Sequence, residues 1–253
     1  MSNEARSRDA SGKHGHTLIS DAKFRRLYAL ALEQAPDASR GLSAAMAAVA
    51  ADLRGDDVVL AQARAAAPDF RDRVITALSG ATADRLRRNG RLTVIVCAGP
   101  GNDPILLDAH QVADEAKLPV LFVEDWRNAG KGSATKKNAQ EPAPGTAREI
   151  GAMPAIPVDA EDVIAVYRVA HESMTRAREG SGPTRILCVR WPAMNASDKK
   201  ADAVGHLEHW LEARGLPAQA WRREILAERQ AAPSDTADEP AEAAEKIREL
   251  RSA

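Results

Sequence analysis

Two long apolar runs with an amphipathic stretch between them occupy the middle of the chain. Residues 91–99, RLTVIVCAG, and 118–125, LPVLFVED, are almost continuously apolar and rich in β-branched side chains, which is typical of strands buried on both faces. Between them, residues 103–117 place apolar side chains at helical spacing. This order predicts a βαβ unit, and residues 184–191, TRILCVRW, predict another buried strand.

Helical periodicity dominates most of the remaining sequence. A helix is expected over 17–34, with Ser20 or Asp21 as its N-cap. Its buried face is expected to consist of Phe24, Leu27, Tyr28, Ala31 and Leu32. Further helices are expected over 41–53, 72–90, 160–180 and most of the chain after Pro192.

Glycines mark two features of the helix expected over 72–90. Ser79-Gly80 in its middle predicts a break, since glycine is unfavourable inside helices. Asn89-Gly90 is a typical helix stop. The helix should therefore end there and lead directly into the strand that begins near residue 91.

The sequence predicts one α/β domain, with a mostly parallel sheet flanked by helices. We expect this domain to cover residues 17–230. Residues 1–16 lack periodicity and predict a disordered tail, and 231–253 predict a charged helical tail. A loop rich in Gly, Pro and Ser is expected over 131–147.

Composition narrows the class of protein. The 253 residues are 44% hydrophobic, only 4% aromatic, and carry a formal net charge of -1, which argues against a nucleic-acid partner. No window approaches the roughly 20 apolar residues of a membrane span, and the amino terminus has no apolar signal core. The expectation is a cytoplasmic protein with no membrane partner.

The two cysteines, Cys97 and Cys188, lie inside or beside apolar runs. A buried, structural thiol is the expected role of each. Cys97 also stands at a turn before a helix, where a thiol pKa can be lowered. No base is evident near it in the sequence, so the structural role is favoured.

The turn after the first long strand, GPGNDP, is a candidate anion site. Backbone N–H groups at a helix N-terminus can hold a phosphate without any side chain. The alternative is a tight turn with Pro104 at the first helical position. In a parallel sheet, residues 99–103 and 125–128 should meet at the carboxyl edge, where such folds bind ligands.

Several phrases, in a consistent order, resemble one family. EIGAMPAIPVDAED, followed by a helix and REGSGPTRILC, is similar to phrases of the alpha subunit of thiamine-diphosphate-dependent 2-oxo acid dehydrogenases, the first components of the pyruvate and branched-chain complexes. LISDAKFRRLYALAL resembles the opening helix of that family, and KLPVLFVED resembles the strand that leads to its metal-binding turn. The resemblance covers, with gaps, residues 17–230.

This resemblance implies the thiamine-diphosphate-binding fold and a set of site residues. It implies thiamine diphosphate and Mg²⁺ as cofactors, with a dehydrogenase beta-like subunit or a second copy of the chain as partner and a lipoyl carrier protein as acceptor. The cofactor-binding candidates are Arg64, Gly99, Gly101 and Asn102. The metal-ligand candidates are Asp103, Asp125 and Asn128.

The sequence departs from the family pattern where ligands are needed. The aspartate of the expected Gly-Asp-Gly motif falls on Ala98 or Pro100, depending on the alignment, and the expected asparagine pair falls near Trp126 and Arg127. The segment between Arg64 and the first long strand is also much shorter than in the family. Two hypotheses follow: an active dehydrogenase alpha subunit, or a degenerate homologue that serves as a structural or regulatory partner.

Other polar residues have simpler explanations. His206 and His209 share a helix face and are candidate metal ligands, but a solvated surface is expected. Asp159 and Asp162 are candidate site residues, but a helix N-cap and a first-turn carboxylate explain them.

Overall fold

The computed structural model describes residues 19–34, 42–61, 69–97, 104–127, 153–190 and 203–231. Within these ranges the chain forms one five-stranded sheet with the order β1-β2-β3-β5-β4. Every neighbouring pair is parallel. The strands are β1 (Val58–Ala61), β2 (Thr93–Cys97), β3 (Val120–Asp125), β4 (Ala155–Asp159) and β5 (Thr184–Val189). The predicted parallel α/β fold is confirmed.

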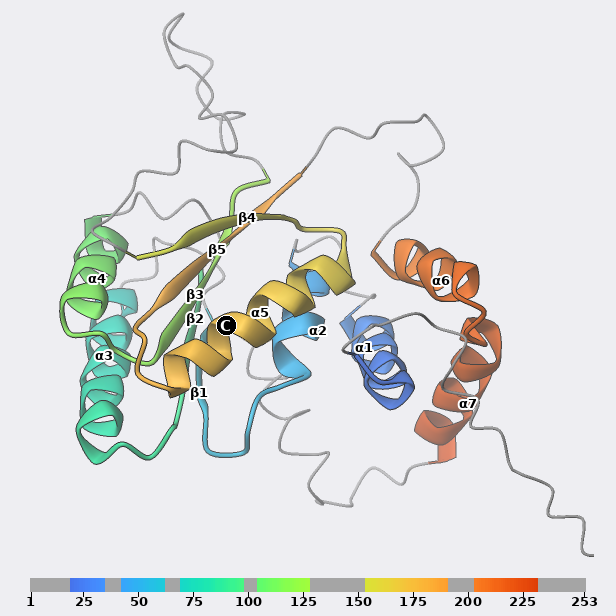
Figure 1. Ribbon diagram of the computed structural model, residues 1–253, viewed down its shortest axis with the longest axis horizontal. Helices are drawn as coiled ribbons and strands as arrows, with labels where there is room; N and C mark the ends of the chain where they lie inside the picture. Colours follow the sequence, from blue (N-terminus) through green and yellow to red (C-terminus); the bar gives the residue numbers. More distant parts are fainter. Residues whose placement is uncertain are drawn as a thin grey trace, which may run out of the picture.

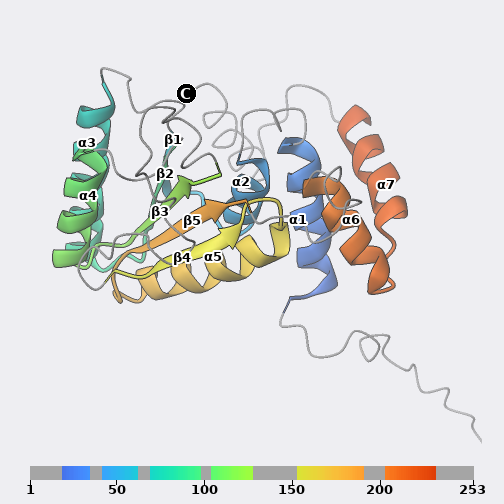
Figure 2. The same cartoon turned by 90° about the horizontal axis from the view of Figure 1, so that it is seen from above.

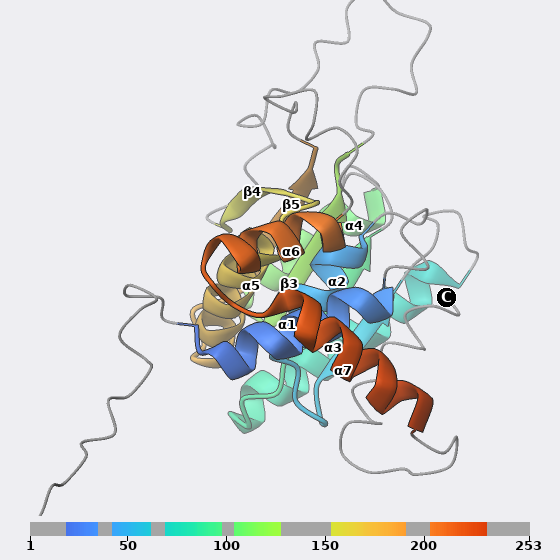
Figure 3. The ribbon, with the colours of Figure 1, turned by 90° about the vertical axis from the view of Figure 1, so that its right-hand side faces the viewer.

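Helices cover both faces of the sheet (Figure 1). One face packs against α3 (Phe70–Arg87) and α4 (Pro104–Glu115). The other packs against α2 (Ser43–Ala50) and α5 (Val163–Arg178). Beyond α2 and α5 lie α1 (Asp21–Gln34), α6 (Ala203–Ala213) and α7 (Ala218–Ala231), which Figures 2 and 3 show as an outer group on one side of the molecule.

The central strand β2 explains why the sheet needs both layers. Its side chains alternate between faces, and all five residues are buried. Val94 and Val96 belong to the core beneath α2 and α5, whereas Ile95 and Cys97 belong to the core beneath α3 and α4. The apolar run over 91–99 predicted a strand covered on both faces, and β2 confirms that prediction.

The first helix follows its sequence pattern closely. Ser20 Oγ accepts a hydrogen bond from the backbone N–H of Lys23 at 3.3 Å, as an N-cap does. The five predicted apolar side chains are buried, and they are Phe24, Leu27, Tyr28, Ala31 and Leu32.

The predicted break in α3 is wrong. The helix runs without interruption through Ser79 and Gly80, because a buried stripe that includes Val74 and Leu78 holds it against the sheet. A single exposed glycine costs about 1 kcal/mol, which such packing outweighs. The helix ends at Arg87, and its C-cap Arg88, whose φ of 53° is left-handed, comes directly before the predicted Asn89-Gly90 stop.

Parts of the predicted organisation fall outside the described residues. These are the tail 1–16, the loop 131–147 and the charged tail 231–253, except for Ala231 at the end of α7. The domain bounds 17–230 stay a prediction. None of the helices in the described part of the chain combines the length and apolar character that crossing a bilayer requires.

Candidate functional site

The carboxyl ends of β2, β3 and β5 meet at one edge of the sheet. Cys97 pairs in register with Glu124, and Asp125 pairs with Cys188. The segments that follow these strands therefore leave from neighbouring positions. This is the edge at which parallel α/β sheets bind ligands.

Most of the predicted site residues fall outside the described ranges. Arg64, Gly99, Gly101, Asn102, Asp103 and Asn128 all do so, and their roles stay predictions. Pro104 is the first residue of α4, as the turn motif predicted. Asp125, at the end of β3, is the one candidate whose surroundings the structure describes.

Asp125 is neutralised by a nearby arginine. Arg127 donates from Nε to Oδ1 at 2.9 Å and from Nη2 to Oδ2 at 2.8 Å. Its backbone N–H also donates to Oδ1 at 3.1 Å. The two side chains are only 14% and 12% exposed. Burial would lower the pKa of Arg127, but the hydrogen bonds and charge of Asp125 raise it. This is a two-point pair of the strongest kind.

A second buried pair lies one residue earlier in β3. Glu124 is fully buried and accepts from Arg185 in β5, at 2.7 Å from Nε and 2.9 Å from Nη2. Trp126 Nε1 donates to the same carboxylate at 2.8 Å. Burial alone would raise the pKa of Glu124, but contacts with His110 and Arg185 lower it from 4.5 to about 2. Glu124 therefore joins β3 to β5 directly below the edge.

His110 of α4 completes this cluster from the covering layer. Its Nε2 lies 3.2 Å from Glu124 Oε1, and its ring packs edge-on against Phe122 with centroids 4.4 Å apart. The side chain is fully buried. Neither ring nitrogen makes a hydrogen bond of good geometry, so the 3.2 Å approach is an electrostatic contact and not an aligned hydrogen bond.

Asp125 does not fit the role of a magnesium ligand in this arrangement. Mg²⁺ requires oxygen atoms in near-octahedral geometry, and both oxygens of Asp125 are engaged by Arg127. Glu124 is likewise held by Arg185. Within the described ranges, no three His, Cys, Asp or Glu side chains gather closely enough to hold a metal ion.

The expected burial of the two cysteines is confirmed. Both are free and buried. Burial raises the pKa of the Cys188 thiol to about 12, and the charge of Asp125 acts in the same direction. Cys188 is therefore a thiol at neutral pH, which makes it unreactive.

The two remaining acidic candidates at this edge also have structural explanations. Asp162 is the N-cap of α5, and its carboxylate accepts from the N–H of Ala165 at 2.9 Å. Asp159, at the end of β4, accepts from the N–H of Glu161 at 3.0 Å. Burial and the neighbouring carboxylates raise the pKa of Asp159. His206 and His209 lie on α6 and are not buried.

The cluster of Glu124, Arg185 and His110 was not predicted from the sequence. A visible signal existed, because Glu124 and Arg185 are charges of opposite sign inside otherwise apolar strands. To predict that they pair, one must know the strand order, in which β5 lies between β3 and β4. Periodicity along the chain carries no information about that order.

Comparison with known proteins assigns the chain to a family. The sequence model of the Dehydrogenase E1 component matches residues 13–210, which is most of the chain. The chain belongs to this family. The resemblance to 2-oxo acid dehydrogenase alpha subunits, drawn from the motifs, is thereby confirmed.

Individual relatives match over shorter stretches. The alpha subunit of acetoin:2,6-dichlorophenolindophenol oxidoreductase from Bacillus subtilis is 35% identical over 95 residues, which cover 37% of this chain and 28% of the relative. The pyruvate dehydrogenase E1 component subunit alpha from Porphyra purpurea is 34% identical over 104 residues, 40% of this chain and 30% of the relative. The chain thus spans under a third of the length of these two relatives.

A solved structure was also found to be similar. It is a candidate thiamin diphosphate-dependent enzyme from Mycobacterium smegmatis, 18% identical, with a TM-score of 0.40. The match covers 58% of this chain and 31% of that one.

Proposed function

We propose that this Dehydrogenase E1 component homologue is a degenerate alpha-type subunit that acts as a structural partner of a beta-type subunit. The observation that supports this proposal is the bidentate pairing of Asp125 by Arg127. The guanidinium of Arg127 donates hydrogen bonds to both carboxylate oxygens of Asp125, which a metal ion would need as ligands. The substitutions at Ala98 or Pro100, and at Trp126, point the same way.

The chemistry of the family depends on anchoring its cofactor. Thiamine diphosphate, when bound, supplies a nucleophilic carbon and an electron sink for decarboxylation. In this chain Gly99, Gly101 and Asn102 would offer backbone groups to phosphates at the start of α4, and Arg64 would offer a cation. Asp103 and Asn128 are the remaining oxygen donors for Mg²⁺. Loss of Asp125 to an internal pair weakens this ligand set.

A beta-type partner is proposed from the class of the relatives. Both curated relatives described above are named as alpha subunits. The described residues form a five-stranded sheet between two covering layers, and in this proposal the outer surface of that scaffold is what the partner contacts. In this proposal the chain is a structural subunit without cofactor chemistry, and another subunit transfers the acyl group to any lipoyl carrier.

The second candidate function is the active enzyme of the family, supported by the match over residues 13–210. In that case the chain would bind thiamine diphosphate and Mg²⁺ together with its partner. It would decarboxylate a 2-oxo acid oxidatively and pass the acyl group to a lipoyl carrier.

Isothermal titration with thiamine diphosphate, with and without Mg²⁺, separates the two candidates. It is carried out on the full chain, alone and with a co-expressed beta-type subunit. For the chain alone, we expect no Mg²⁺-dependent heat of binding at millimolar thiamine diphosphate. We also expect that neither sample turns over any 2-oxo acid. Micromolar, Mg²⁺-dependent binding by the chain alone, or turnover that is lost in Asn128→Ala, would overturn the proposal.

A restored site gives a positive control. The double variant Ala98→Asp, Arg127→Asn returns a carboxylate to the glycine turn, frees Asp125 and supplies an amide oxygen. We expect it to gain Mg²⁺-dependent affinity for thiamine diphosphate. The matched control is Arg190→Asn, which breaks an exposed pair with Glu161 and should gain none.

A further inference from the structure

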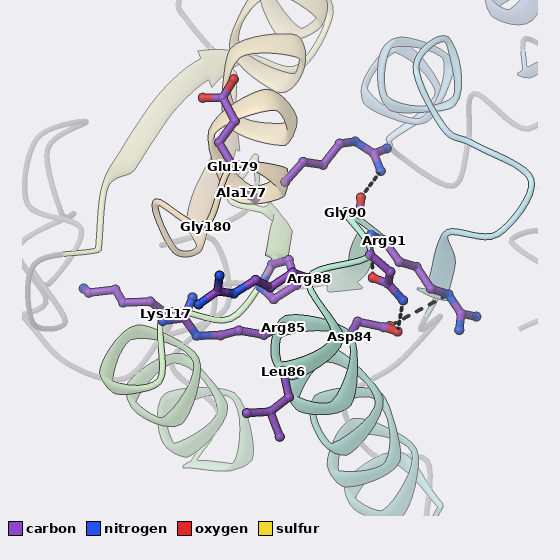
Figure 4. A pocket seen from close by; sticks show the side chains of 13 residues that line it. Asp84, Arg85, Leu86, Arg88, Gly90, Arg91, Lys117, Ala177, Glu179 and Gly180 are labelled. Atoms are coloured by element: carbon purple, nitrogen blue, oxygen red, sulfur yellow. Dashed lines mark hydrogen bonds and ion pairs between the residues drawn. The ribbon is translucent and has the colours of Figure 1, made fainter.

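A cleft opens at the opposite, amino edge of the sheet, away from the edge expected to bind the cofactor. Its volume is about 660 Å³, which lies in the range of small-molecule sites. The end of α3, the turn from α4 into β3 and the end of α5 form its walls. Figure 4 shows it from close by. Its cationic lining residues are Arg85, Arg88, Arg91, Lys117 and Arg178.

Two of these cations lie in an unfavourable backbone conformation. Among the described residues, Arg88 and Lys117 are the two non-glycine residues with positive φ, at 53° and 48°. Arg88 directly follows α3, and Lys117 follows the end of α4 by two residues; glycine would adopt this conformation without steric cost. At Lys117 the conformation closes α4, because the N–H of Lys117 donates to Asp114 O at 3.1 Å and that of Leu118 to Ala113 O at 2.9 Å. Arg88 and Lys117 both project a long cationic side chain into the same cleft.

Three of the five cations are already paired. Arg178 pairs with Asp57 at 2.6 Å, and Lys117 pairs with Asp114 at 2.6 Å. Arg91 lies 3.8 Å from Asp84, whose Oδ1 also accepts from Asn89.

Arg85 and Arg88 have no carboxylate partner among the described residues. In Figure 4 both side chains extend towards Lys117, whereas the carboxylate of Glu179 points away from them. Among the described residues, the cleft therefore presents two guanidinium groups that no carboxylate neutralises.

The helix dipole explains only part of this arrangement. Cations near a helix C-terminus are stabilised by its partial negative charge, and this accounts for Arg85 in the last turn of α3. It does not account for a cation at the left-handed position itself, where backbone strain opposes any side chain. The parallel topology explains why the two helix ends share one cleft, because α3 and α4 each lead into a parallel strand and so both end at the amino edge of the sheet.

We propose that this cleft binds a phosphate-bearing small molecule, with Arg85 and Arg88 as its principal ligands and Lys117 beside them. A guanidinium presents donors in a planar fork that matches phosphate oxygens. Two such forks suit a diphosphate better than a single carboxylate. The proposal is independent of the cofactor edge, because the two sites lie at opposite ends of the strands.

Titration with inorganic pyrophosphate tests the proposal. We expect the full chain to bind it, and the double variant Arg85→Gln, Arg88→Gln to bind at least about tenfold more weakly. The control is Arg71→Gln, which removes one positive charge from an exposed residue at the other end of α3 and should leave affinity within about twofold; each single variant, Arg85→Gln and Arg88→Gln, matches it in charge and should lower affinity further than that. Succinate, a dicarboxylate, should bind more weakly than pyrophosphate.

The variant Arg88→Gly provides a readout that a merely structural arginine would not give. Glycine relieves the left-handed strain and removes the guanidinium, so the melting temperature should rise by about 2–4 °C while pyrophosphate affinity falls. No binding by the unmodified chain, affinity unchanged in the double variant, or tighter binding of succinate would each overturn the proposal. In particular, unchanged affinity in the double variant would place pyrophosphate at the carboxyl edge instead.

Discussion

At the scale of single residues, the carboxyl edge is characterised by charges that neutralise each other. Asp125 is paired with Arg127, and Glu124 with Arg185. Opposite charges at low exposure satisfy one another without any ligand, and removing one partner leaves the other buried and uncompensated. Within the described residues these pairs join β3 to β5 and to the turn after β3, and they leave neither oxygen of Asp125 without an arginine donor.

Glu124→Gln should strongly destabilise the fold. The amide removes the carboxylate charge that the Arg185 guanidinium, only 2% exposed, contacts through two hydrogen bonds, at an expected cost of about 3–5 kcal/mol in the free energy of unfolding. Urea unfolding measures this. The control, Glu161→Gln, breaks an exposed pair with Arg190 and should cost under about 1 kcal/mol. Equal effects of the two variants would contradict this reading of the cluster.

The same pair predicts a pH dependence. The pKa of Glu124 is lowered from 4.5 to about 2 in the folded chain, so the unfolded state binds a proton first as the pH falls. The stabilisation is fully present above about pH 4.5 and is lost progressively towards pH 2. The difference in unfolding free energy between the chain and Glu124→Gln should therefore shrink across that window, and a constant difference would contradict it.

At the scale of elements, apolar periodicity predicted most of the structure, and backbone strain was what it missed. The buried face of α1 and the strands β2, β3 and β5 follow directly from the spacing of apolar residues. The break proposed at Gly80 was wrong, because local propensity lost to the packing of a buried stripe. The left-handed conformation of Arg88 carried no signal, since arginine is not a residue associated with it.

Two glycines of this region should respond in opposite ways to alanine. Gly80 lies inside α3 with no atom within 4 Å of an added Cβ, so Gly80→Ala should stabilise the chain by about 0.5–1 kcal/mol. Gly90 has a φ of 72°, so Gly90→Ala should destabilise it by about 1–2 kcal/mol. Thermal unfolding of the two variants measures both. A destabilising effect of Gly80→Ala would contradict the helical conformation of Gly80 in α3.

At the scale of the whole molecule, the sequence predicted the fold class, which the structure confirms. The edge at which ligands would bind stays a prediction, and the structure describes one of the seven predicted site residues. The fold was predictable because a parallel sheet covered on both faces leaves continuous apolar runs. The pairing of Asp125 was not, because a carboxylate followed two residues later by an arginine reads equally well as a metal ligand beside a loop cation. Only side-chain geometry separates the two.

The proposed role as a partner subunit makes a prediction about assembly. If this chain has a structural role and no cofactor chemistry, the mass of its complex with a beta-type subunit should not change when metal is removed. Light scattering with size exclusion, in Mg²⁺ and thiamine diphosphate and then in EDTA without cofactor, should give the same mass. The EDTA-insensitive complex should persist in Asp125→Asn, because that side chain is bound internally by Arg127. Dissociation in EDTA would instead show a metal-dependent interface, and would favour the active enzyme of the family.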